Sequence, residues 1–236
     1  MGNDRCGIEF NVPPDGVGIT AYNNTGGEVY IGDVVYLTYS GTEGQEVIAN
    51  LPATNTSPTV LEAVCIEDCA KESIGKFQIK GTCKQANVHT TTDIAKNDFL
   101  EMVNGVAFDG TATNLAFVKG DATTEDTITD SDDGLVTDGF KAGMNIVVAN
   151  ATSAANNKTH KIKTVAAGTL TLESYGQLVS EAGNAGTTIK AQGFLQKDGT
   201  SKTVNSPAVA KEARTANNVG AIKVYLIGEP VQLAAS

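Results

Sequence analysis

Cysteine is the residue type whose spacing first suggests chemistry in this chain of 236 residues; the four are Cys6, Cys65, Cys69 and Cys83. Three residues separate Cys65 from Cys69, and Cys83 follows fourteen residues later, a spacing that matches no strong zinc-site pattern. Two alternatives remain for these thiols. Either Cys65 and Cys83 form a disulfide between neighbouring strands, or the cysteines are free and pack as small, half-buried apolar side chains. We expect neither a metal nor a cofactor.

Neither histidine lies in a sequence that indicates catalysis. His89 stands at the edge of an expected strand and His160 lies in a polar turn, so we expect both to be exposed or at a rim. A general base or a catalytic triad would need a histidine with a partner. The chain also lacks G-x-S-x-G, H-E-x-x-H and Walker A motifs. The sequence therefore predicts that the protein is not an enzyme.

An acidic run at residues 130–134 begins like a calcium-binding loop. Its glycine, Gly134, comes one position too early, and Lys141 stands where such a loop supplies a bidentate glutamate. We interpret the run as a solvated acidic turn and expect no calcium there.

The charge and the distribution of apolar residues exclude two classes of partner. The formal net charge is -10, and no basic stripe with interleaved aromatic residues is present, so we expect no nucleic acid partner. No segment approaches the roughly 18 apolar residues that span a bilayer, so we expect no membrane partner. The N-terminal sequence lacks the apolar stretch of a signal peptide. Synthesis in a cytosol is the expectation that follows.

The elements that must position these residues are predicted to be short β-strands. The composition, with 25 glycines and many Thr, Asn, Ala and Val residues, is typical of strands joined by tight turns. Strand patterns recur at residues 29–39, 46–49, 59–69, 76–81, 99–103 and 221–227. One short helix is expected near the C-terminus, with Ser206 as its N-cap, Pro207 at its first position and Gly220 at its end.

Residues 117–196 differ in character from the rest of the chain. Their apolar segments are short and evenly spaced between turn signals, as in a small β-sandwich or barrel. We therefore predict an inserted β domain at 117–196, within a discontinuous β domain made of residues 19–116 and 197–236. Residues 1–18 are predicted to form an extended N-terminal arm.

The discontinuous domain resembles a family of phage head decoration proteins. The resemblance rests on the segments GGEVYIGDVVYLTYSG, VLEAVCIEDCAKESIGKFQIKGTCKQANV, IAKNDFLEMVNGVAFDG and PAVAKEARTANNVGAIKVYLIG. Ala63-Val64-Cys65 stands where the family pattern has Gly-Val-Ala. The resemblance implies an all-β protein whose main domain is similar to the β-tulip of lambda-type decoration proteins, barrel-like and with a short helix near the C-terminus.

Residues 127–189 resemble a small β module that recurs in phage virion proteins. We call the positions that carry this resemblance the module landmarks. They are Asp130, Gly139, Phe140, Gly143, Ile146, Val148, Asn157, Val165, Leu170 and Leu172.

Together these resemblances imply a virion structural protein, a decoration or cement protein on the capsid exterior. Such a protein binds the major capsid protein, cross-links capsomers and stabilises the head, and it is made in the cytoplasm of the bacterial host. The family also implies a homotrimer at threefold or quasi-threefold positions.

The N-terminal arm is the segment that we expect to contact the capsid or a neighbouring copy. Ile8, Phe10 and Val12 alternate within a Pro/Gly-rich stretch that has nothing local to pack against. The inserted domain is then expected to face outward.

Two alternatives remain open at this point. The chain is a tail or head-fibre component, or, in a different class, a secreted adhesin or carbohydrate-binding module. The last would show a shallow groove with exposed Trp or Tyr, and this chain has no Trp.

Overall fold

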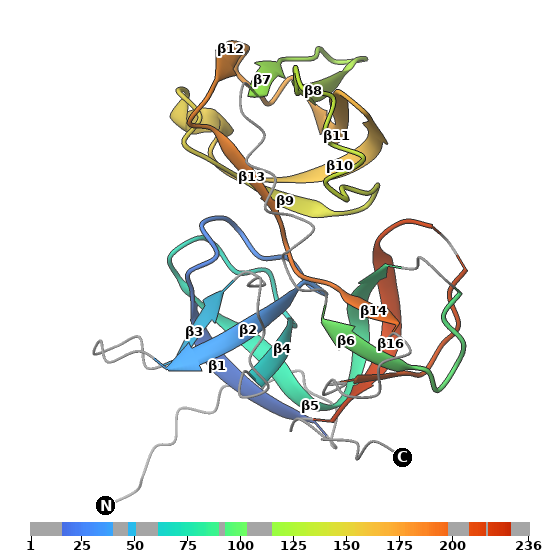
Figure 1. The fold of residues 1–236 in the computed structure, drawn as a ribbon. Helices are drawn as coiled ribbons and strands as arrows, with labels where there is room; N and C mark the ends of the chain where they lie inside the picture. Colours follow the sequence, from blue (N-terminus) through green and yellow to red (C-terminus); the bar gives the residue numbers. More distant parts are fainter. Residues whose placement is uncertain are drawn as a thin grey trace, which may run out of the picture.

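The computed structural model describes residues 16–39, 47–50, 61–89, 93–102, 115–197, 208–215 and 217–227. Over these residues the fold is all-β, as predicted: the chain forms short strands, together with a three-residue 3-10 helix at Ala154–Asn156. The strands form one nine-stranded and one seven-stranded sheet. Figure 1 shows the two sheets as separate bodies that meet along one boundary.

The nine-stranded sheet begins with a closed five-stranded barrel. Its strands follow one another in the order β1, β3, β2, β4 and β5, and β5 pairs back onto β1. They are β1 (Val17–Asn23), β3 (Val47–Asn50), β2 (Val34–Tyr39), β4 (Leu61–Cys65) and β5 (Ile74–His89). A buried cluster that includes Val35, Ala63 and Phe77 fills its interior.

The rest of this sheet forms a second ring on the same long strand. From β5 the pairing runs through β14, β6, β15 and β16 and returns to β5. The added strands are β14 (Leu195–Lys197), β6 (Phe99–Met102), β15 (Ala208–Ala210) and β16 (Gly220–Leu226). Its core is a second cluster that includes Val88, Leu100 and Val224. We call the two rings together the barrel unit.

The 16 residues of β5 belong to both rings. Its first half, up to Lys80, pairs with β1 and β4, and its second half, from Gly81, pairs with β16 and β14. Gly81 has φ of +89°, a left-handed conformation that L side chains rarely adopt, so glycine is needed where the strand passes from one ring to the other.

Strands β2 and β4 explain why the sequence shows continuous apolar runs. Val34 and Val64 pack into the core of the second ring, whereas their neighbours Val35 and Ala63 pack into the first. Both faces of these strands are buried, so the usual alternation of apolar and polar residues is absent.

The seven-stranded sheet is curled and has its own core. The strand order is β12, β7, β8, β11, β10, β9 and β13. Their bounds are β7 (Leu115–Val118), β8 (Glu125–Thr129), β9 (Asn145–Ala149), β10 (Thr159–Ala166), β11 (Thr169–Tyr175), β12 (Glu181–Asn184) and β13 (Thr188–Ala191). We call residues 115–191 the curled-sheet unit. The chain passes from β13 into β14 of the barrel unit through residues 192–194.

The helix predicted between Ser206 and Gly220 is wrong. Ala208–Ala210 form strand β15 instead, and Gly220 is the first residue of β16. Ala208 and Ala210 are fully buried, and β15 pairs with both β6 and β16. Pairing within the ring therefore overrides the capping signals, which are local preferences worth little against packing. Ser206 and Pro207 lie outside the described residues. Within the described part, no helix is long and apolar enough to cross a membrane.

We predict that Phe77→Ala destabilises the barrel unit by about 3–5 kcal/mol, because Phe77 is fully buried at the centre of the first ring. Phe99→Ala is the matched control, since Phe99 is 44% exposed and should cost far less. Urea unfolding of each variant measures the difference, and equal losses would contradict this account of the core.

Candidate functional site: the contact between the two units

The three cysteines among the described residues are free thiols; Cys6 lies outside the described residues. Cys65, Cys69 and Cys83 are buried and form no disulfide, so of the two alternatives the structure has free thiols, although Cys65 and Cys83 line one cavity of about 270 Å³. Cys65 donates to the carbonyl oxygen of Glu67 and Cys83 to that of Gln85. Burial raises the pKa of all three thiols. They therefore stay protonated and unreactive at neutral pH.

The prediction that both histidines are exposed is wrong. His89 is 4% and His160 5% exposed. The His89 ring packs edge-on against Phe194, and Nε2 of His160 lies 3.2 Å from the carbonyl oxygen of Asn156. Burial lowers the pKa of both side chains, because the charged form is poorly solvated there. Both histidines therefore serve packing.

The acidic run has a structural role. Asp130 is buried and accepts hydrogen bonds from the backbone N–H groups of Asp132 and Gly134, at 2.9 and 3.0 Å. These bonds shape the turn after β8. Among the described residues, no group of three or more His, Cys, Asp or Glu side chains is placed to hold a metal ion.

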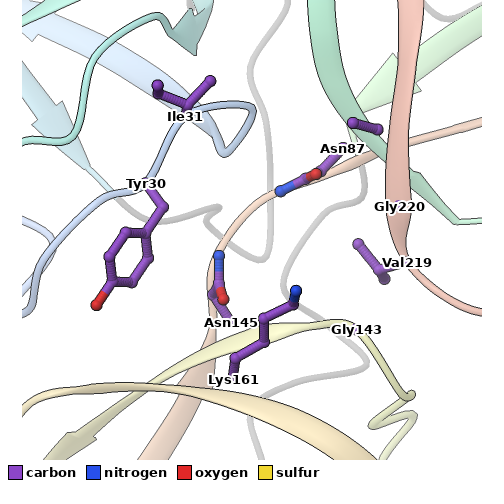
Figure 2. Close-up of a pocket in the computed structure, with 9 residues that line it drawn as sticks. Tyr30, Ile31, Asn87, Gly143, Asn145, Lys161, Val219 and Gly220 are labelled. Carbon is purple, nitrogen blue, oxygen red and sulfur yellow. The ribbon is translucent and has the colours of Figure 1, made fainter. Parts of the chain in front are cut away.

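The most unusual polar group in the described structure is the carboxylate of Asp33, which lies where the two units meet and is 1% exposed. From the barrel unit, Asn87 Nδ2 donates to it at 2.9 Å and the backbone N–H of Tyr30 at 2.9 Å. From the curled-sheet unit, Asn145 Nδ2 donates to both carboxylate oxygens, at 3.0 and 3.2 Å. Figure 2 shows the side chains of Asn87 and Asn145 directed into the same space between the two units.

The buried carboxylate has an environment that disfavours its charge. Within the described residues, no Lys or Arg forms an ion pair with Asp33. Burial raises its pKa to about 7, and the hydrogen bonds from Tyr30, Asn145 and Asn87 offset only part of that effect. Asp33 is therefore a carboxyl group that titrates near neutral pH.

A cavity of about 410 Å³ opens beside this contact. Its lining residues come from both units, as Figure 2 shows: Tyr30, Ile31, Asn87, Gly143, Asn145, Lys161, Val219, Gly220 and Ala221. Most of its polar groups are already engaged. Tyr30 donates its hydroxyl to Glu28, and Lys161 pairs with Glu173 at 3.3 Å. The two amides donate to Asp33. Of these bonds, the one from Asn145 to Asp33 joins the two units.

Further contacts across the boundary surround Asp33. The carbonyl oxygen of Glu28 accepts from Thr159 Oγ1 at 2.7 Å and from Gln192 Nε2 at 3.0 Å. The backbone N–H of Val219 donates to the carbonyl oxygen of Ala142 at 2.9 Å. The side chains of Val219 and Phe194 are part of the curled-sheet core. Through Val219, the segment before β16 thus contributes an apolar side chain to the core of the curled-sheet unit.

The sequence does not predict this contact between the two units. Asp33 lies between two apolar segments of the predicted strand region at 29–39, and Asn145 stands within an apolar strand. An amide among buried apolar residues is the signal that indicates a partner, because a buried polar group needs one. Ile8, Phe10 and Val12 lie outside the described residues.

No family model, no curated protein and no solved structure matches this chain.

We predict that Gly143→Ala weakens the docking of the two units. Gly143 has φ of +84°, and a Cβ there would lie 2.2 Å from the backbone oxygen of Val219. The strained conformation alone costs about 1–3 kcal/mol. Gly186→Ala is the control, because its Cβ would meet only Asn184 Oδ1 at 3.5 Å. Limited proteolysis should cut between the units faster in Gly143→Ala only; equal rates would contradict the prediction.

Proposed function

We propose that the protein is a structural component of a bacteriophage particle, a decoration protein that binds the capsid exterior and cross-links capsomers. It acts by binding and catalyses no reaction. Its partners are the major capsid protein and further copies of itself, in a trimer. The observation that carries the proposal is the role of the module landmarks in the curled-sheet unit.

Those landmarks each serve the fold. Phe140, Ile146, Val148, Leu170 and Leu172 form much of the buried core, and Val165 packs against it. Gly139 and Gly143 adopt positive φ, and Asp130 shapes the turn after β8. The Asn157 side chain bonds in both directions to the backbone of Ala151. The pattern that resembles a recurrent virion module is therefore the pattern that builds this unit, which supports a shared fold.

The contact between the two units supports a role in which the protein carries mechanical force between capsomers. A protein that cross-links capsomers must transmit force without yielding at an internal joint. Here only residues 192–194 separate β13 from β14, and side chains of both units bond to Asp33 and Glu28. Because this connection is short and Val219 and Phe194 pack into the core of the curled-sheet unit, the chain can act as one body.

A direct test compares purified particles of the encoding phage with particles that lack this protein, imaged by electron cryomicroscopy. We expect extra density on the outside of the head, at threefold positions, only in the complete particles. Heads without the protein should also rupture at lower temperature. Density on the tail would favour the fibre or tail alternative. Absence from the particle would contradict the proposal.

We predict that deleting residues 2–14, which contain Ile8, Phe10 and Val12, abolishes binding to capsids while the barrel unit stays folded. The matched control is Val118→Ser with Val179→Ser, since these valines are 49% and 45% exposed on the curled-sheet unit. Cosedimentation with undecorated capsids measures binding, and circular dichroism checks the fold. Unchanged binding after the deletion would rule out the arm as the contact.

A simpler measurement distinguishes a decoration protein from a tail-tube protein. A tube protein is expected to assemble into rings without a capsid, whereas a decoration protein stays a small oligomer. Analytical ultracentrifugation of the purified chain distinguishes them.

A further inference from the structure

The carboxyl group of Asp33 belongs to both units only while they are docked. In the docked protein it is 1% exposed, and the amide of Asn145 covers it from the curled-sheet unit. If the units separate, Asn145 is withdrawn and water replaces it. The proton affinity of Asp33 therefore depends on whether the units are docked.

We propose that Asp33 makes the contact between the two units dependent on pH, so that a protonated carboxyl group favours the docked arrangement and an ionised one weakens it. This inference does not depend on capsid binding, and it concerns the purified chain alone.

The direction follows from the proton balance. In the docked protein the pKa of Asp33 is about 7, whereas a carboxyl group in water has its ordinary value of 3.8. If separation of the units lets water reach Asp33, its pKa moves toward that ordinary value, so docking takes up a proton. The proton's contribution to docking is fully present below the lower pKa and is lost as the pH rises through the upper one. Alkaline conditions therefore loosen the contact.

The protonated form can be accommodated locally. Among the described residues, the groups that hydrogen-bond to the carboxylate are donors, from Tyr30, Asn87 and Asn145. An asparagine amide carries an acceptor oxygen beside its donor nitrogen, so turning one amide over supplies an acceptor for the new O–H. The contact can then keep its hydrogen bonds with either amide as the acceptor.

The other titratable groups around Asp33 do not reproduce this behaviour. Asp68 adds repulsion from the β4–β5 connection, and burial raises the pKa of Cys65 at the end of β4, so this thiol stays neutral. Tyr30 and Glu28 share a hydrogen bond, and the pKa of the tyrosine is raised by burial. Across the cavity, Lys161 of β10 pairs with Glu173. Further along β5, the pKa of His89 is lowered, which moves its titration toward acid.

The first test is a carbon-13 NMR titration of the Asp33 carboxyl group in the full-length protein. We expect a midpoint near pH 7. A midpoint below about 4.5, the range of ordinary carboxyl groups, would overturn the proposal. This measurement needs no variant and so does not depend on any substitution being tolerated.

The second test follows docking itself by amide hydrogen exchange. The backbone N–H of Val219 bonds across the boundary to Ala142, whereas that of Ile162 bonds within the curled-sheet unit to Met144. After correction for base catalysis, the protection of Val219 relative to Ile162 should fall about tenfold between pH 6 and pH 8. A ratio that does not change with pH would contradict the inference.

Two variants assign the effect to Asp33. In Asp33→Asn the protection of Val219 relative to Ile162 should no longer depend on pH, whatever its absolute value. Asp121→Asn is the matched control, because Asp121 lies in the β7–β8 turn, where hydrogen bonds from Thr123 lower its pKa to about 2, and it should keep the wild-type dependence. If Asp33→Asn keeps that dependence too, another group is responsible.

Discussion

The structure depends on how one buried carboxyl group is satisfied. Asp33 has no cationic partner among the described residues, so its charge is balanced only by N–H donors. Two of the donors belong to the barrel unit and one side chain, Asn145, to the curled-sheet unit. Burying a carboxylate that lacks partners is costly, whereas burying one with several donors is tolerated. The arrangement of the two units is thus specified by hydrogen-bond geometry and not by apolar area alone.

The long strand β5 organises the barrel unit in a comparable way. Because it closes two rings, a change in its register would disturb both cores at once. Strands β2 and β4 also serve two cores, because one face of each strand packs into the first ring and the other face into the second ring.

The fold class follows from the sequence because its signals are repeated many times. Short apolar segments, frequent glycines and turn residues recur along the chain, and each one favours β-structure. The single helix signal was wrong because Ser206, Pro207 and Gly220 describe only local preference, whereas Ala208 and Ala210 are held by ring partners far away in sequence.

The candidate site was not predictable for a related reason. Asp33 and Asn145 are 112 residues apart, and neither belongs to a motif. His89 and His160 were predicted to be exposed because each stands next to polar residues in the sequence, whereas the fold buries both side chains. Burial of a polar residue is decided by long-range packing, which a single sequence does not display. The module landmarks were visible because turns and core positions are spaced locally.

The two-ring use of β5 also sets the order in which the chain can fold during synthesis. The first ring needs residues only up to Lys80, so it can close early. All strands of the curled-sheet unit have been made by Ala191, although its core also takes in Phe194 and Val219 from later in the chain. The second ring must wait for β16, which pairs with a strand made more than a hundred residues before it. Val219, which enters the core of the curled-sheet unit, emerges just before that strand. Val219 and strand β16 must therefore be synthesised before the second ring and the contact between the two units can be completed.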